Sequence, residues 1–255
     1  MRSVLVIAGN TFREVIRDRV LYGLIVFAVM LLFLSLALGQ LSFDENIRLS
    51  ANFGFTGIHI AVVVLAVFVG STLVSKEIDK QTILTLLARP ISRAQFILGK
   101  SVGLMSVLVV VATGLAFILS AFLFFLGFKF TPHYLTAVLG VLLEAGVLLA
   151  LAMFFGSFAR PMMTVVFTVA VFLLGHWVES LHFFIKKSES SLFKMGGTAI
   201  TYVVPDLEAF NWRSAPVYAI EVPSGQILAA VGASVGWVLV LTALTVLIFR
   251  RRDFV

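Results

Sequence analysis

The sequence predicts an all-α integral membrane protein with six transmembrane helices, and three observations lead to that class. Of the 255 residues, 60% are hydrophobic and only 13% are charged, whereas an ordinary soluble domain has roughly 25% charged residues. Six apolar runs are long enough, or nearly so, to cross about 30 Å of hydrocarbon as helices. No stretch alternates apolar and polar residues in the way that a membrane β-barrel requires. We expect one transmembrane domain over residues 1–255, with spans at 20–39, 58–74, 102–128, 134–158, 162–178 and 226–249.

The distribution of basic residues predicts that both termini lie in the cytoplasm. With the N-terminus inside, thirteen of the 19 Lys and Arg residues fall on cytoplasmic segments and six on outer segments. Cytoplasmic segments of membrane proteins are enriched in these residues. The net charge of +6 therefore reflects topology rather than nucleic-acid binding. The chain has no cysteine, which excludes disulfides and thiolate metal sites.

Residues 1–19 precede the first span and have an amphipathic pattern. Leu5, Ala8, Phe12 and Val15 recur at helical spacing, while charged residues such as Arg13 fall elsewhere. This predicts a helix that lies in the cytoplasmic membrane interface. A leader that only anchors the chain fits the same pattern.

The outer side is predicted to carry one short loop, over residues 40–57, and one large loop, over residues 179–225. A third connection, between the spans at 102–128 and 134–158, is so short that these two helices should form an antiparallel hairpin. The large loop contains seven aromatic residues, which suits short helices at the level of the lipid headgroups. Its Asp206, Glu208 and Trp212 are candidates for contact with an extracytoplasmic partner.

The cytoplasmic segment 76–101 is far longer than a simple connection between two spans requires. We expect a short helix with Glu77 and Asp79 at its positive end, because its apolar residues recur at helical spacing. Pro90 should end this helix, and Ser92 with Gln95 predicts a capping box at the start of the next one. The segment is either a docking element for a cytoplasmic partner or a hairpin that covers the helix ends.

The stretch AQFILGKS, residues 94–101, ends like a phosphate-binding loop but does not fulfil its requirements. Ala94 stands where the first glycine belongs, no strand precedes it, and Lys100 leads into a membrane span. A phosphate-binding loop is glycine-rich and connects a strand to a helix. We therefore expect this chain to bind no ATP.

The cytoplasmic segment resembles the signature region of membrane subunits of type-2 ATP-binding-cassette (ABC) exporters. The start, TFREVIRDRVLYGL, is similar to the connecting helix of that family, and FRRRDF is similar to its cytoplasmic ending. The outer stretch VVPDLEAFNW is similar to a branch labelled as permeases for copper-enzyme maturation. The signature positions are Glu77, Thr82, Leu86, Leu87, Pro90, Ser92, Arg93, Gly99 and Lys100.

The resemblance implies a permease subunit in the bacterial cytoplasmic membrane that is not itself an enzyme. Two permease copies would surround the pathway, in a homodimer or with a related chain, and two separate ATPase subunits would bind ATP and Mg. The helix Ile78–Leu87 would enter a groove on the ATPase. The residues expected to couple the two subunits are Glu77, Ile78, Lys80, Thr82, Ile83, Leu86, Leu87, Arg89, Pro90, Ser92 and Arg93.

Glu144 is the one charged residue well inside a predicted span. An ionised acid there costs about 2.5–3.5 kcal/mol on insertion scales, so such residues usually have a function. One interpretation is a contact with cargo or a proton in the pathway. The other is a protonated carboxyl that is hydrogen-bonded to a Ser, a Thr or a backbone carbonyl.

The four histidines, His59, His133, His176 and His182, all fall in the outer half of the predicted topology. No two have ligand spacing and no carboxylate pairs with them in the sequence, so we expect no metal. The glycine pair Gly232–Gly236 permits close helix packing, within the subunit or between subunits.

Two other functional classes fit parts of the pattern. A self-contained ion- or proton-coupled carrier would use Glu144, and a membrane scaffold without transport would use the cytoplasmic segment. The long segment favours the permease, because a carrier does not need it.

Overall fold

The chain folds into a bundle of long helices, and the computed structural model describes residues 2–40, 45–79 and 92–251. Six of the described helices (α2, α3, α5, α6, α7 and α10) are long and apolar enough to cross a membrane. This confirms the predicted all-α membrane class. The elements are α1 (Arg2–Ile16), α2 (Arg19–Gly39), α3 (Asn46–Asp79), α5 (Arg93–Phe125), α6 (His133–Gly156), α7 (Pro161–Lys187), α8 (Ser191–Val203), the 3-10 helix η1 (Glu208–Phe210), α9 (Ala215–Tyr218) and α10 (Ser224–Arg251).

Helix α6 is at the centre of the bundle and packs against α3, α5, α7 and α10. Small residues on its faces, among them Ala137, Gly140 and Ala145, permit this close approach. On α3, a Cβ added at Gly70 would lie only 2.7 Å from Cβ of Ala152 on α6. The two central helices therefore depend on small side chains where they meet.

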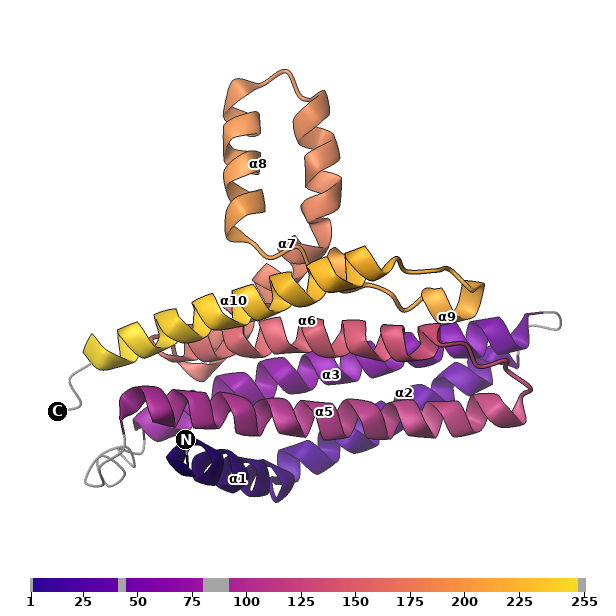
Figure 1. Ribbon diagram of the computed structural model, residues 1–255, viewed down its shortest axis with the longest axis horizontal. Helices are drawn as coiled ribbons and strands as arrows, with labels where there is room; N and C mark the ends of the chain where they lie inside the picture. Colours follow the sequence, from indigo (N-terminus) through magenta and orange to yellow (C-terminus); the bar gives the residue numbers. More distant parts are fainter. Residues whose placement is uncertain (1, 41–44, 80–91, 252–255) are drawn as a thin grey trace.

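Helices α5 and α6 form the predicted antiparallel hairpin (Figure 1). Gly127 ends α5 with φ of 81°, a conformation that glycine adopts without strain. The N–H of Phe128 then bonds to the Leu123 carbonyl at 2.9 Å. Tyr134, at the start of α6, donates to the Ala116 carbonyl on α5. These bonds bring the start of α6 against α5.

Helix α3 differs from the prediction at both ends. It begins at Asn46, inside the segment expected as an outer loop, and continues to Asp79. Its first turns are polar: Arg48 pairs with Glu45 at 3.1 Å, and Asn52 donates to the Tyr218 hydroxyl at 3.1 Å. A hydropathy pattern locates only the apolar part of a helix, and these turns extend beyond that part.

The large outer loop is also more helical than a connection. Helix α7 continues to Lys187, and α8 returns beside it. Figure 1 shows this α7–α8 hairpin projecting sideways from the bundle, across its long axis. We call the end of the bundle that carries α9 the outer end, following the predicted topology.

Helix α1 is docked on α5 rather than being a free leader. Ile7, Ala8, Thr11 and Val15 are buried. A Cβ added at Gly103 of α5 would lie 2.6 Å from the Ala8 carbonyl oxygen, so only glycine permits this approach. The largely buried Lys100 Nζ lies 3.4 Å from Glu14 Oε2, which fixes the register of the two helices. The location of α1 in the membrane interface stays a prediction.

Replacing Gly103 with valine should detach α1 from α5. The added side chain has no space, and overpacking of this kind costs about 1–3 kcal/mol. The melting temperature of the detergent-solubilised chain measures the loss. Gly114→Val is the matched control, because Gly114 lies on the same helix with nothing within 4 Å of its missing Cβ. Equal shifts for the two variants would contradict this packing.

Candidate functional site

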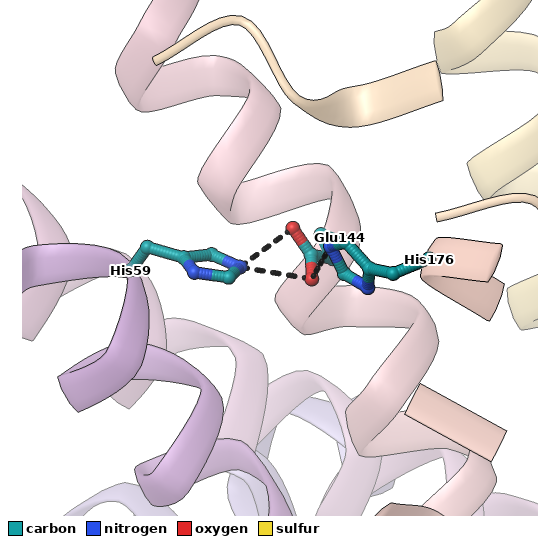
Figure 2. A group of neighbouring side chains, drawn as sticks. All are labelled: His59, Glu144 and His176. Carbon is teal, nitrogen blue, oxygen red and sulfur yellow. Dashed lines mark hydrogen bonds and ion pairs between the residues drawn. The ribbon is translucent and has the colours of Figure 1, made fainter. Parts of the chain in front are cut away.

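Three spans and an outer segment bring a group of charged side chains together inside the bundle. His59 comes from α3, Glu144 from α6 and His176 from α7 (Figure 2). Glu208 of η1 and Arg213, a few residues later, approach from the outer end. We call these five residues, together with Asn211, the polar ring.

Glu144 is 1% exposed and His59 is 4% exposed. His59 Nε2 lies 2.9 Å from both carboxylate oxygens of Glu144. His176 Nε2 lies 3.6 Å from Glu144 Oε1 and 4.0 Å from Glu208 Oε2. Glu144 therefore faces two imidazoles from two other helices.

The rest of the ring is a chain of hydrogen bonds. Asn211 Nδ2 donates to Glu208 Oε1 at 2.6 Å, and Arg213 Nε donates to Asn211 Oδ1 at 2.8 Å. Arg213 Nη1 lies 2.6 Å from His59 Nδ1. A guanidinium can only donate, so His59 Nδ1 must accept. His59 then carries its hydrogen on Nε2 and donates it to Glu144.

Burial lowers the pKa of the Arg213 guanidinium below its ordinary value, and the charges of Glu144 and Glu208 oppose that shift. Arginine stays protonated under ordinary conditions. The two acids therefore share one fixed positive charge.

The outer segment, residues 204–214, reaches the ring because two glycines admit its backbone. The Leu207 N–H donates to the Gly175 carbonyl of α7 at 3.2 Å, and a Cβ at Gly175 would lie 2.7 Å from Leu207 Cγ. On α6, a Cβ at Gly140 would collide with the Phe210 carbonyl oxygen. Leu207 and Phe210 are both buried. The segment is thus seated between α6 and α7.

This seating changes the interpretation of the outer-loop candidates. Trp212 is buried, and Glu208 turns its carboxylate toward His176 and Asn211. Both residues contact their own chain instead of facing outward. Asp206 remains exposed and bonds to the Glu208 N–H at 3.2 Å.

The expectation that no carboxylate pairs with the histidines is wrong for His59 and His176. Of the two interpretations of Glu144, the bond to a Ser, a Thr or a backbone carbonyl does not match the structure, where the partners of Glu144 are imidazoles. Local spacing could not reveal this, since the three residues lie on three different helices. The signal in the sequence was weaker: an acid well inside a predicted span, with all four histidines in the outer half of the predicted topology.

His59, Glu144 and His176 offer ligand atoms within 4.8 Å of one another, and two histidines with a glutamate are a known zinc ligand set. The bond from Arg213 argues against a metal here. It places the hydrogen of His59 on Nε2, the atom that would have to bind the ion. The expectation of no metal stays a prediction.

A cavity of about 220 Å³ lies between α3 and α7 beside the ring. It is apolar except for His59. Its lining residues are His59, Ile60, Val63, Val64, Val67, Phe68, Val169 and Phe172.

The site at the other end of the bundle, which we call the cytoplasmic end following the predicted topology, is described in part. The capping box at the start of α5 is confirmed: Gln95 N–H donates to Ser92 Oγ at 3.2 Å, and Ser92 N–H donates to Gln95 Oε1 at 3.1 Å. Arg93 Nη1 donates to the Phe249 and Arg250 carbonyls at 2.8 and 3.0 Å. Arg93 therefore joins α5 to the end of α10, a role that the sequence did not suggest.

Glu77 and Ile78 lie in the last turns of α3. The prediction that Glu77 and Asp79 begin a separate helix is wrong, because no residue between the span and Asp79 interrupts α3. The remaining coupling candidates, Lys80, Thr82, Ile83, Leu86, Leu87, Arg89 and Pro90, lie outside the described residues.

A comparison with known protein families finds one match over nearly the whole chain. The family model described as "ABC-2 family transporter protein" matches residues 5–254. A search of curated proteins finds no match. The family match includes the polar ring, most of α1 and the cytoplasmic segment.

Replacing Arg213 with methionine should destabilise the fold, because the facing acids lose their fixed positive partner. An unsatisfied buried polar group costs on the order of 1–3 kcal/mol. Adding Glu144→Gln should restore part of the loss, since it removes one negative charge. Thermal unfolding of the two single variants and the double variant measures the coupling. Arg48→Met, at an exposed pair, is the control, and strictly additive losses would contradict the ring.

Proposed function

Because this chain belongs to the ABC-2 family of transporter proteins and is the permease subunit of an ABC transporter, we propose that it forms an export pathway driven by separate ATPase chains. It is an integral membrane protein. The proposed location is the bacterial cytoplasmic membrane, with both termini in the cytoplasm, as the basic residues predict.

The helical conformation of residues 94–101 supports a separate ATPase. This stretch, which ends like a phosphate-binding loop, is continuous helix within α5, and its Lys100 pairs with Glu14. A phosphate-binding loop needs free backbone N–H groups between a strand and a helix. ATP would therefore bind to the partner, and this chain would supply the pathway.

The contacts at the cytoplasmic end support coupling through residues 76–101. The segment includes the last residues of α3 and the first residues of α5. Helix α1 packs against α5 at Gly103, and Arg93 of α5 donates a hydrogen bond to the end of α10. If the ATPase displaces the segment, α1, α3, α5 and α10 should therefore move together. This arrangement, with Arg93 at its centre, is the observation that carries the proposal.

Two features of α7 support a second permease copy. Its large apolar side chains are exposed along the helix, including Val169 and Trp177, and the α7–α8 hairpin projects from the bundle. Helix α7 also lines the apolar cavity, through Val169 and Phe172. We propose that the pathway runs between two copies, with α3 and α7 on its wall.

Replacing Arg93 with alanine should leave membrane insertion intact and reduce ATP-driven transport several-fold. The side chain spans two helices with two charge-assisted bonds, so its loss should let α10 move independently of α5. Turnover by the reconstituted complex, compared with the amount of bound ATPase, measures this. Arg160→Ala, at an exposed position on the same predicted side, is the control. Wild-type transport by the Arg93 variant would contradict the proposed role.

The purified complex should contain two permeases and two ATPases, which native mass measurement decides. Because the chain lacks cysteine, a single Val169→Cys should cross-link two permeases with a bismaleimide. Leu239→Cys, exposed on α10, should not. A particle that transports with one permease would refute the assembly.

A further inference from the structure

One atom of the polar ring has no hydrogen-bond partner. His176 Nε2 is buried and unpaired. The other nitrogen, Nδ1, lies 3.1 Å from the Phe172 carbonyl oxygen. A carbonyl can only accept, so Nδ1 carries hydrogen. In a neutral imidazole, Nε2 would then present a bare lone pair to its surroundings.

Those surroundings are carboxylates. Glu144 Oε1 lies 3.6 Å away, and Glu208 Oε2 lies 4.0 Å away. A neutral His176 would thus place three acceptors together with no hydrogen between them. A proton on Nε2 would place a positively charged N–H between the Glu144 and Glu208 carboxylates.

The charges of the ring lead to the same conclusion. With both acids ionised, Glu144 and Glu208 carry two negative charges, and Arg213 carries one positive charge. His59 accepts from Arg213, so it is neutral and cannot supply the second. These are the titratable and charged groups that face His176 from α3, α6, η1 and the outer segment. One positive charge is missing, and one proton on His176 balances the group.

We propose that His176 Nε2, between Glu144 and Glu208, is a buried proton-binding site that holds the outer segment against α6 and α7. With the proton bound, His176 attracts Glu208 of η1 and closes the ring. When the proton leaves, Glu208 faces an uncompensated acid, and residues 204–214 separate more readily. The site therefore stabilises the fold while the proton is bound, and this stability is lost when the proton leaves at higher pH.

A divalent metal ion suits the site less well than a proton. It would leave a net positive charge in place of neutrality, and it would require Arg213 to leave His59. The proton also needs no change in the positions of the six ring residues. The site stands on these contacts alone and does not depend on the direction of transport.

The test uses the purified full-length chain, with melting temperatures measured between about pH 5 and 8.5. As pH rises across this range, the melting temperature of the wild type should fall by on the order of 5 °C more than that of His176→Gln. Glutamine offers an amide N–H but binds no proton, so the melting temperature of His176→Gln should depend less on pH. His182→Gln, at an exposed histidine on the same helix, should follow the wild type. Parallel curves for wild type and His176→Gln would overturn the proposal.

Two further measurements locate the effect. Hydrogen exchange of the Leu207 amide, corrected for intrinsic rate, should quicken with pH in the wild type but not in His176→Gln. Ring NMR of the wild type serves where that variant does not fold. It should show one histidine that loses only its Nε2 hydrogen as pH rises, and the absence of such a ring would refute the site. Stoichiometric stabilisation by added zinc at pH 8, removed by chelator, would assign the site to a metal instead.

Discussion

A carboxyl group in the middle of a membrane helix must find its partners within the protein, because hydrocarbon offers none. Glu144 imposes that requirement on the outer half of this permease. Its partners come from α3 and α7, so those helices must approach α6 closely. Its balancing charge comes from Arg213, so the outer segment must descend between α6 and α7. Gly140 and Gly175 leave the space that this descent needs. The arrangement of three spans and an extramembrane segment thus follows from one acid.

The cytoplasmic end is held together in a different way, by close backbone contact and helix-end bonds. Gly103 admits α1, and Arg93 holds the end of α10. The two ends are joined by α3, whose 34 residues extend about 50 Å as a helix. It carries His59 toward one end and Glu77 at the other. Helix α3 therefore connects the polar ring with the segment proposed to couple to the ATPase.

The sequence was sufficient for features that depend on neighbouring residues. The apolar runs revealed the six spans, and Ser92 with Gln95 revealed the start of α5. Features that join distant residues were not accessible. His59 and Glu144 are 85 positions apart, and Arg93 lies 156 positions from Phe249. The early start of α3 at Asn46 was missed because polar turns resemble a loop when hydropathy is the only guide.

The ring and the neighbouring cavity have opposite character, which bears on what Glu144 does. The cavity wall consists of valine, isoleucine and phenylalanine side chains, with His59 as its one polar member. Both oxygens of Glu144 accept from His59 Nε2, and Arg213 occupies His59 Nδ1. The one polar group that a charged cargo in the cavity would meet is His59, and both of its ring nitrogens are already bonded. Binding such a cargo would require the ring to break first. The geometry thus favours Glu144 as the group that holds the outer end together over Glu144 as a direct contact for cargo.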